Sequence, residues 1–162
     1  ISSGGAVLEV ANYNSENQVV VSGHAAAVEE LKRRLKEKNI RSLPLNVSAP
    51  FHSSIMRPAA DKLRARLSQI SLRAPAVPII SNVSGQLYSS EDDISENLAA
   101  QVVRPVRWVQ SIRTACELGV NLFVEVGSKS VLKNLNRNIC SEVCSLSLDV
   151  EEDLRKFEAL LR

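Results

Sequence analysis

The sequence predicts an α/β fold, and three observations support this prediction. Short apolar runs alternate with segments whose apolar residues recur at helical spacing, as in parallel sheets covered by helices on both faces. Proline and glycine residues mark boundaries between these segments. The chain has 162 residues, of which 44% are hydrophobic and 23% charged, so one globular domain is the expected organisation.

The first part of the chain predicts a hairpin, a helix and a further strand. The turn-forming residues 14–17 lie between two apolar runs, which is typical of a β-hairpin. Val28, Leu31 and Leu35 then share helical spacing, and an alternating pattern follows them. The expected elements are strands at residues 6–13 and 18–22, a helix at 25–38 and a strand at 41–47. This order indicates most of a small α+β subdomain that lacks a strand and a helix at its front.

The pattern changes after residue 48, which divides the chain into residues 1–48 and 49–162. Pro58 suits the first turn of a helix, and Glu91-Asp92-Asp93 place acidic charge at the start of another. Pro105 and Gly119 then end two successive helices. The expected helices lie at residues 58–69, 91–103, 106–118 and 128–139 and at the C-terminus, and the expected strands at 77–81, 120–126 and 145–148.

Composition argues against several classes of partner. A net charge of +2 and an aromatic content of 4% give no basis for nucleic-acid binding, and no apolar run approaches the ~18 residues of a membrane span. Three cysteines, an odd number, argue against a disulfide framework and indicate a reducing compartment. Cys140 and Cys144 are spaced to share a helix face, but both histidines lie far away, so we expect no metal site.

His52 is the first candidate for chemistry, because histidine exchanges protons near neutral pH and the chain has two of them. Pro50 pushes Ala49 toward extended geometry, so we expect His52 on a loop where a strand ends. Position alone leaves a structural or surface histidine as the alternative. A histidine base also needs a nucleophile, and the Gly-x-Ser-x-Gly motif typical of α/β enzymes is absent from the sequence.

Six sequence segments in one order resemble the malonyl-CoA:acyl-carrier-protein transacylases of fatty-acid synthesis. The segments are Asn12-Tyr-Asn-Ser-Glu-Asn-Gln-Val-Val-Val-Ser-Gly-His24, Leu43-Pro-Leu-Asn-Val-Ser-Ala-Pro-Phe-His-Ser53, Met56-Arg-Pro-Ala-Ala60, Ser81-Asn-Val83, Gln101 with Pro105-Val-Arg-Trp108, and Phe123-Val-Glu-Val-Gly127. The resemblance covers about residues 6–140. It implies the C-terminal half of the family's domain: a partial α/β-hydrolase-like large subdomain at residues 49–162, with most of an inserted ferredoxin-like small subdomain at residues 1–48.

The resemblance also implies an activity and its partners. The family transfers a malonyl group from CoA to the phosphopantetheine thiol of acyl carrier protein, without a cofactor and through a serine carried by its N-terminal half. We therefore expect this chain to need that half, and to be inactive alone. The family also implies a bacterial cytoplasmic location, with a mitochondrion or plastid as alternatives.

Site residues follow from the resemblance position by position. His52 matches the general base and acid of the family, and Gln101 matches a glutamine whose main-chain carbonyl orients the imidazole. Phe51 matches a ring that disfavours methylmalonyl units, although one methyl group is worth only about 1–3 kcal/mol of discrimination. Asn12 and Asn14 match a family segment that faces the active-site cleft. Asn82 follows the strand expected at residues 77–81, at the end where ligands gather in parallel sheets, and turn-forming roles are the alternative for all three. A basic surface for carrier protein or CoA phosphates is a weaker possibility at Lys62, Arg64, Arg66 and Lys129.

Two other functions remain open. The first is a non-catalytic relative that binds carrier protein or another partner. The second is an unrelated esterase with Ser48 or Ser53 as nucleophile, and it is disfavoured because neither serine lies on a strand-to-helix elbow.

Overall fold

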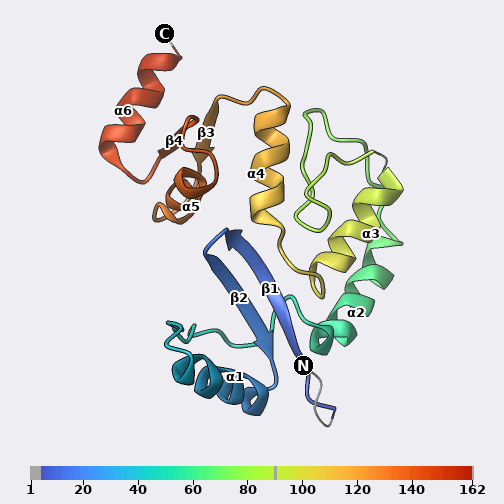
Figure 1. Cartoon of the computed structure of the whole chain (residues 1–162). Helices are drawn as coiled ribbons and strands as arrows, with labels where there is room; N and C mark the ends of the chain where they lie inside the picture. Colours follow the sequence, from blue (N-terminus) through green and yellow to red (C-terminus); the bar gives the residue numbers. More distant parts are fainter. Residues whose placement is uncertain (1–4, 90, 162) are drawn as a thin grey trace.

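The computed structural model describes residues 5–89 and 91–161, which form two small sheets and seven helical segments (Figure 1). The helical segments are α1 (Ala25–Glu37), the 3-10 turn η1 (Ser54–Met56), α2 (Arg57–Leu67), α3 (Glu91–Gln101), α4 (Trp108–Glu117), α5 (Val131–Ile139) and α6 (Glu151–Leu160). The strands are β1 (Leu8–Ser15), β2 (Gln18–Gly23), β3 (Leu122–Glu125) and β4 (Cys144–Ser147). Of the helices in these described ranges, none combines the length and apolar character needed to cross a membrane.

The predicted hairpin and first helix are confirmed. β1 pairs antiparallel with β2 from Leu8 opposite Gly23 to Ser15 opposite Gln18. His24 precedes the first residue of α1, and its Nδ1 accepts a 2.8 Å hydrogen bond from the backbone N–H of Val7. This bond ties the start of α1 to the chain just before β1.

The strand predicted at residues 41–47 is wrong, since this segment is irregular and exposed. Its apolar side chains at Leu43, Leu45 and Val47 are 60–69% exposed, and Pro44 has no backbone N–H to contribute to a ladder. A strand forms when a neighbour pairs its backbone groups, and no strand in the described ranges lies beside this segment. The alternation of apolar and polar residues at 41–47 is therefore not sufficient to form a strand.

The prediction of a buried strand at residues 77–81 is also wrong. It is reduced to one antiparallel bridge between Ile80 and Leu87, and Val77 is 68% exposed. Ser81 is the buried member of the segment, and its hydroxyl donates a 2.8 Å hydrogen bond to Oδ1 of Asn97 on α3. The segment is therefore anchored through a polar side chain rather than through an apolar core.

The helix pair α2–α3 forms one side of the molecule (Figure 1). A fully buried alanine on each helix, Ala60 and Ala99, allows the two backbones to approach closely. Arg64 of α2 donates two hydrogen bonds of 3.0 and 3.1 Å to the Glu96 carboxylate of α3. These contacts fix the axis of α3 and thereby the position of its last residue, Gln101.

The C-terminal part of the chain is a β-α-β-α unit. β3 and β4 pair in parallel, so the two strands predicted there are confirmed, but the parallel sheet in the described residues has two strands rather than several. Glu125 at the end of β3 accepts hydrogen bonds of 3.1 and 2.9 Å from the N–H groups of Leu132 and Lys133, which caps α5. Asp153 of α6 is buried, forms an ion pair with Lys133 and accepts the N–H of Ser147 at 2.9 Å.

Strand β1 joins these parts. Its free edge pairs with Val106, which donates to the Ala11 carbonyl at 2.8 Å and accepts from the Tyr13 N–H at 2.9 Å. Val106 lies between the end of α3 and the start of α4. β1 therefore holds the α3–α4 connection on one edge and the hairpin partner β2 on the other (Figure 1).

Candidate functional site

His52 lies in the irregular turn between the exposed segment 41–48 and η1, in a left-handed conformation with φ of 60°. A residue other than glycine pays about 1–3 kcal/mol for such a backbone, so the surroundings must hold it there. Its N–H donates a 3.2 Å hydrogen bond to the carbonyl of Val102, and its Nδ1 lies 2.9 Å from the carbonyl oxygen of Gln101. Two consecutive carbonyls thus hold one histidine.

The end of α3 supplies both acceptors for a simple reason. The last carbonyls of an α-helix have no partner within the helix and are available to other donors. Gln101 is the last residue of α3, and Val102 follows it directly. The turn at His52 thus satisfies carbonyls that the helix itself leaves free.

The distance to Gln101 also determines which ring nitrogen carries the proton. A carbonyl oxygen can only accept, so Nδ1 of His52 must be the donor of the 2.9 Å hydrogen bond. The side-chain amide of Gln101 could donate only to an unprotonated Nδ1, but its Nε2 lies farther away, at 3.4 Å, so the shorter contact with the carbonyl assigns the proton to Nδ1. In the neutral ring, Nε2 of His52 is therefore unprotonated and free to take a proton from another group.

The turn is held from its other side by β1. Both carboxylate oxygens of Glu9 accept hydrogen bonds from Ser54, one from its backbone N–H at 2.6 Å and one from its hydroxyl at 2.9 Å. Within the turn, the buried Ser53 hydroxyl donates to the carbonyl of Pro50 at 2.7 Å. The histidine is therefore fixed by a helix end, a strand and its own turn.

A hollow of about 390 Å³ opens beside the ring. It is lined by Glu9, Val10, Tyr13, His52, Ser54, Arg57, Val103, Arg104 and Pro105. Its lining holds the guanidinium groups of Arg57 and Arg104 against the single Glu9 carboxylate, and no carboxylate within the described ranges forms an ion pair with either arginine. The space next to His52 is therefore electropositive, which suits an anionic ligand.

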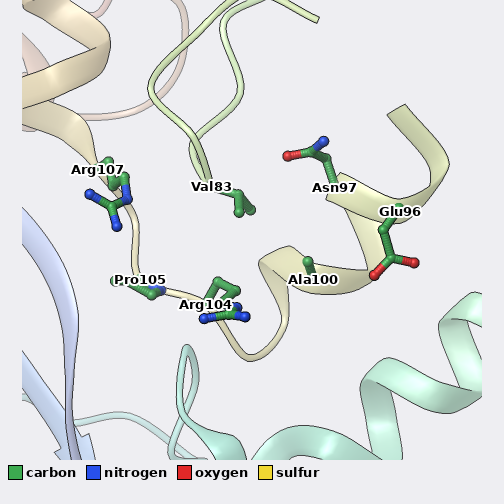
Figure 2. A pocket seen from close by; sticks show the side chains of 7 residues that line it. All are labelled: Val83, Glu96, Asn97, Ala100, Arg104, Pro105 and Arg107. Atoms are coloured by element: carbon green, nitrogen blue, oxygen red, sulfur yellow. The ribbon is translucent and has the colours of Figure 1, made fainter. Parts of the chain in front are cut away.

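A second hollow, of about 380 Å³, adjoins the first and shares Arg104 and Pro105 with it. Figure 2 shows Arg107 and Glu96 at opposite ends of this hollow, with Ala100 and Asn97 of α3 between them. The Glu96 carboxylate is already bound by Arg64, so this second space also retains positive charge. The two hollows form one surface around the segment that links α3 to α4.

The structure brings some of the sequence-predicted site residues together and leaves others apart. His52 and Gln101 are in contact. Phe51 is adjacent in sequence but 46% exposed, and it does not line either hollow. Asn12 and Asn14 lie on β1, next to the lining residue Tyr13, and are half-buried without lining the hollows themselves.

Asn82 is exposed, and its main-chain carbonyl accepts a 2.9 Å hydrogen bond from the N–H of Arg107. Two of the residues expected to form a basic surface already have partners. Arg64 pairs with Asp61 and Glu96, and Arg66 binds the side chain of Gln69. Sequence reasoning did not single out Glu9, Tyr13, Arg57 or Arg104. Arg57 lies within a family-like segment, whereas Glu9 is recognisable only once β1 and Ser54 are placed together.

The cysteines do not share a helix face, because Cys140 follows the last residue of α5 and Cys144 begins β4. Burial, with a contribution from the Cys140 thiol, raises the pKa of the Cys116 thiol to about 11. No group of three or more metal-ligating side chains occurs among the residues that the structure describes.

Comparison with known proteins gives one consistent result. The family model described as an acyl transferase domain matches residues 6–152. The malonyl CoA-acyl carrier protein transacylase of Escherichia coli (strain K12) is 38% identical over 146 residues, which are 90% of this chain and 47% of that protein. The chain thus spans about half the length of the curated relatives it matches.

Solved structures agree. A malonyl-CoA:acyl carrier protein transacylase from Xanthomonas oryzae superposes with a TM-score of 0.92 at 30% identity, over 98% of this chain and 51% of that one. A malonyl-transacylase in complex with a type II PKS acyl-carrier protein gives a TM-score of 0.89 at 33% identity, over 94% of this chain and 50% of that one. The α/β fold predicted from the sequence is thus the fold of these transacylases, over about half their length.

Proposed function

Because the chain belongs to the acyl transferase domain family, we propose that it is the histidine-bearing half of a malonyl-CoA:acyl-carrier-protein transacylase. The hydrogen bond between His52 Nδ1 and the Gln101 carbonyl carries this proposal. It leaves Nε2 free as a base, which is the arrangement that serine acyl transfer requires. The nucleophilic serine belongs to the half of the domain that this chain does not span.

In the first half-reaction, Nε2 of His52 takes the proton of the serine hydroxyl as its oxygen attacks the malonyl thioester carbonyl. The C–S bond to CoA then breaks, and the imidazolium returns the proton to the leaving thiolate. In the second half-reaction, Nε2 takes the proton of the phosphopantetheine thiol, whose sulfur attacks the malonyl-serine ester. The ring then protonates the departing serine oxygen, so the cycle follows ping-pong order.

The remaining site residues take supporting roles in this proposal. Phe51 crowds an α-methyl group and so favours malonyl over methylmalonyl units, while Asn12, Asn14 and Asn82 contact the substrate. The electropositive hollow beside His52 and the second hollow that adjoins it suit the phosphates of CoA and an acidic carrier protein. No cofactor or metal takes part. Residues 1–48 belong to the small subdomain and residues 49–162 to the large one.

Exposed apolar side chains support the need for a second half. Leu43, Leu45 and Val77 are 60–69% exposed on the two segments where strands were expected, and surfaces of this kind mark protein contacts. We propose that the N-terminal half of the domain covers these segments and completes their backbone pairing. We place the parent protein in the bacterial cytoplasm, with an organelle as the alternative.

A chimeric chain tests the proposal. In it, the N-terminal part of the Escherichia coli transacylase, which carries the serine, precedes residues 6–162 of this chain. We expect malonyl transfer to carrier protein by the chimera and none by the 162-residue chain alone. His52→Ala should lower transfer at least ~10²-fold without loss of the folded circular dichroism spectrum, because a general base contributes at least that much.

Two results would contradict the proposal. One is labelled malonyl bound covalently to the 162-residue chain alone. The other is full transfer by a folded His52→Ala chimera, which would favour the alternative of a non-catalytic relative that binds carrier protein.

A further inference from the structure

Glu9 makes an unusual contact for a strand residue, because it uses both carboxylate oxygens on one residue 45 positions away. Oε2 accepts the backbone N–H of Ser54 at 2.6 Å, and Oε1 accepts the Ser54 hydroxyl at 2.9 Å. Both partners are partly buried, which limits competition from water. A paired acceptor of this kind fixes the direction of the Ser54 backbone as well as its position.

The turn that carries His52 has few other supports. Its internal hydrogen bonds run from Phe51 to Ala49, from Ser53 to Pro50 and from Met56 to Ser53. Apart from these local bonds and the Arg57 N–H that is donated to the Ser54 carbonyl, the hydrogen bonds given for residues 50–54 within the described chain are those of His52 to the end of α3 and those of Ser54 to Glu9. The left-handed backbone at His52 is thus held between a helix end and one carboxylate.

The same strand also positions the acceptor of the imidazole. Ala11 and Tyr13 of β1 exchange hydrogen bonds of 2.8 and 2.9 Å with Val106, five residues after Gln101. Glu9 lies two residues before Ala11 on the same strand, next to the β-bulge between Val10 and Asn12. β1 therefore sets both sides of the contact between His52 and Gln101, through Glu9 on one side and the Val106 pairing on the other.

We propose that Glu9 is a positioning residue for His52, which holds Ser54 so that the imidazole Nδ1–H stays on the Gln101 carbonyl. Its consequence for catalysis rests on the proposed function, whereas its effect on the ring does not. The role requires an acceptor for the Ser54 N–H rather than a negative charge. A glutamine can replace it, since its oxygen accepts the N–H and its amide donates to the Ser54 hydroxyl.

Nitrogen-resolved NMR of the histidine rings tests the proposal on the 162-residue chain itself. At ~pH 8 the chemical shifts of the two ring nitrogens report which tautomer the neutral imidazole adopts. His52 should show the Nδ1–H form. His24, whose Nδ1 accepts the Val7 N–H at 2.8 Å, should show the Nε2–H form and serves as an internal reference.

Four variants separate the alternatives. In Glu9→Ala and Glu9→Met, the His52 signals should move toward the average of the two tautomers, while those of His24 stay unchanged. Glu9→Gln should retain the wild-type His52 signals. Glu16→Ala is the matched control, because it removes an exposed ion pair with Arg113 from the same hairpin and should leave both histidines unchanged. If Glu9→Ala does not fold, the His52 signals of Glu9→Met test the role of Glu9, because methionine preserves the side-chain volume.

Wild-type His52 signals in a folded Glu9→Met or Glu9→Ala chain would overturn the proposal. In the chimera, Glu9→Ala should lower kcat about tenfold or more with little change in KM, since a misplaced base slows chemistry rather than binding. An inactive chimera would refute the proposed function and leave the NMR test of Glu9 intact. An active chimera with Glu9-independent ring signals would refute the role of Glu9 alone.

Discussion

The imidazole of His52 is bound by the main-chain carbonyl of Gln101, with 2.9 Å between Nδ1 and the oxygen. Every residue has such a carbonyl, so the contact depends on where α3 ends rather than on the glutamine side chain. The Gln101 amide could donate only to an unprotonated Nδ1, and its nitrogen lies farther away, at 3.4 Å. This distinction has a direct consequence for mutagenesis.

Gln101→Ala should therefore leave the His52 ring in its Nδ1–H form, and the chimera should retain transfer within a few-fold of wild type. Ring-nitrogen NMR and a transfer assay measure the two effects. A shift of the His52 tautomer in Gln101→Ala would show that the amide, and not the main chain, orients the ring.

Ala99→Leu should destabilise the protein by about 1–3 kcal/mol, because Ala99 is fully buried where α3 packs against α2. The displaced helix should also move the Gln101 carbonyl and alter the His52 ring signals. Urea unfolding measures the first effect. Ala65→Leu on the exposed face of α2 is the control and should leave stability nearly unchanged. Equal stability of the two variants would contradict the close packing of α2 and α3.

Asp153→Asn should destabilise the C-terminal unit by about 2 kcal/mol near neutral pH, because it leaves Lys133 without its buried partner. The hydrogen bond from Lys133, then that from the Ser147 N–H, holds the pKa of the Asp153 carboxyl below its ordinary value. A depressed pKa stabilises the folded state above the unfolded pKa of about 3.9, and this stabilisation is lost as the pH falls through the lower folded value.

The stability difference between wild type and Asp153→Asn should consequently shrink as the pH is lowered from ~6 to below ~3. Urea unfolding at several pH values measures this difference. The exposed pair of Glu152 and Lys156 supplies the control, since Glu152→Gln should have little effect at any pH. A difference that stays constant with pH would show that the Asp153 charge does not contribute.

Cysteine alkylation at ~pH 8 should modify the exposed Cys144 first and Cys116 last. A pKa of about 11 instead of the ordinary 9.0 lowers the thiolate fraction of Cys116 about 100-fold. A thiolate with a higher pKa is more nucleophilic, which offsets part of this decrease. The alkylation rate of Cys116 should therefore be about tenfold lower than that of a cysteine with an ordinary pKa. Mass spectrometry of timed iodoacetamide reactions measures the order, and rapid labelling of Cys116 would contradict its burial.

Local pattern predicted the elements that carry their own stabilising signals. The hairpin at β1–β2 follows from a turn between two apolar runs, and α1 and α4 follow from helical spacing with clear ends. The segments 41–47 and 77–81 have strand-like patterns but no neighbouring strand in the described residues. A strand is defined by its partner, and local pattern does not supply one.

The sequence by itself determined the family, the place of His52 after Pro50 and the absence of a serine motif, because ordered segments and residue spacing are properties of the chain. Only the tertiary structure decided which nitrogen of His52 is free, because that depends on a carbonyl 49 residues away at the end of α3. It alone also revealed Glu9, whose contact with Ser54 exists only when β1 lies beside the turn. Proton position and turn geometry are set by through-space hydrogen bonds, which sequence spacing does not encode.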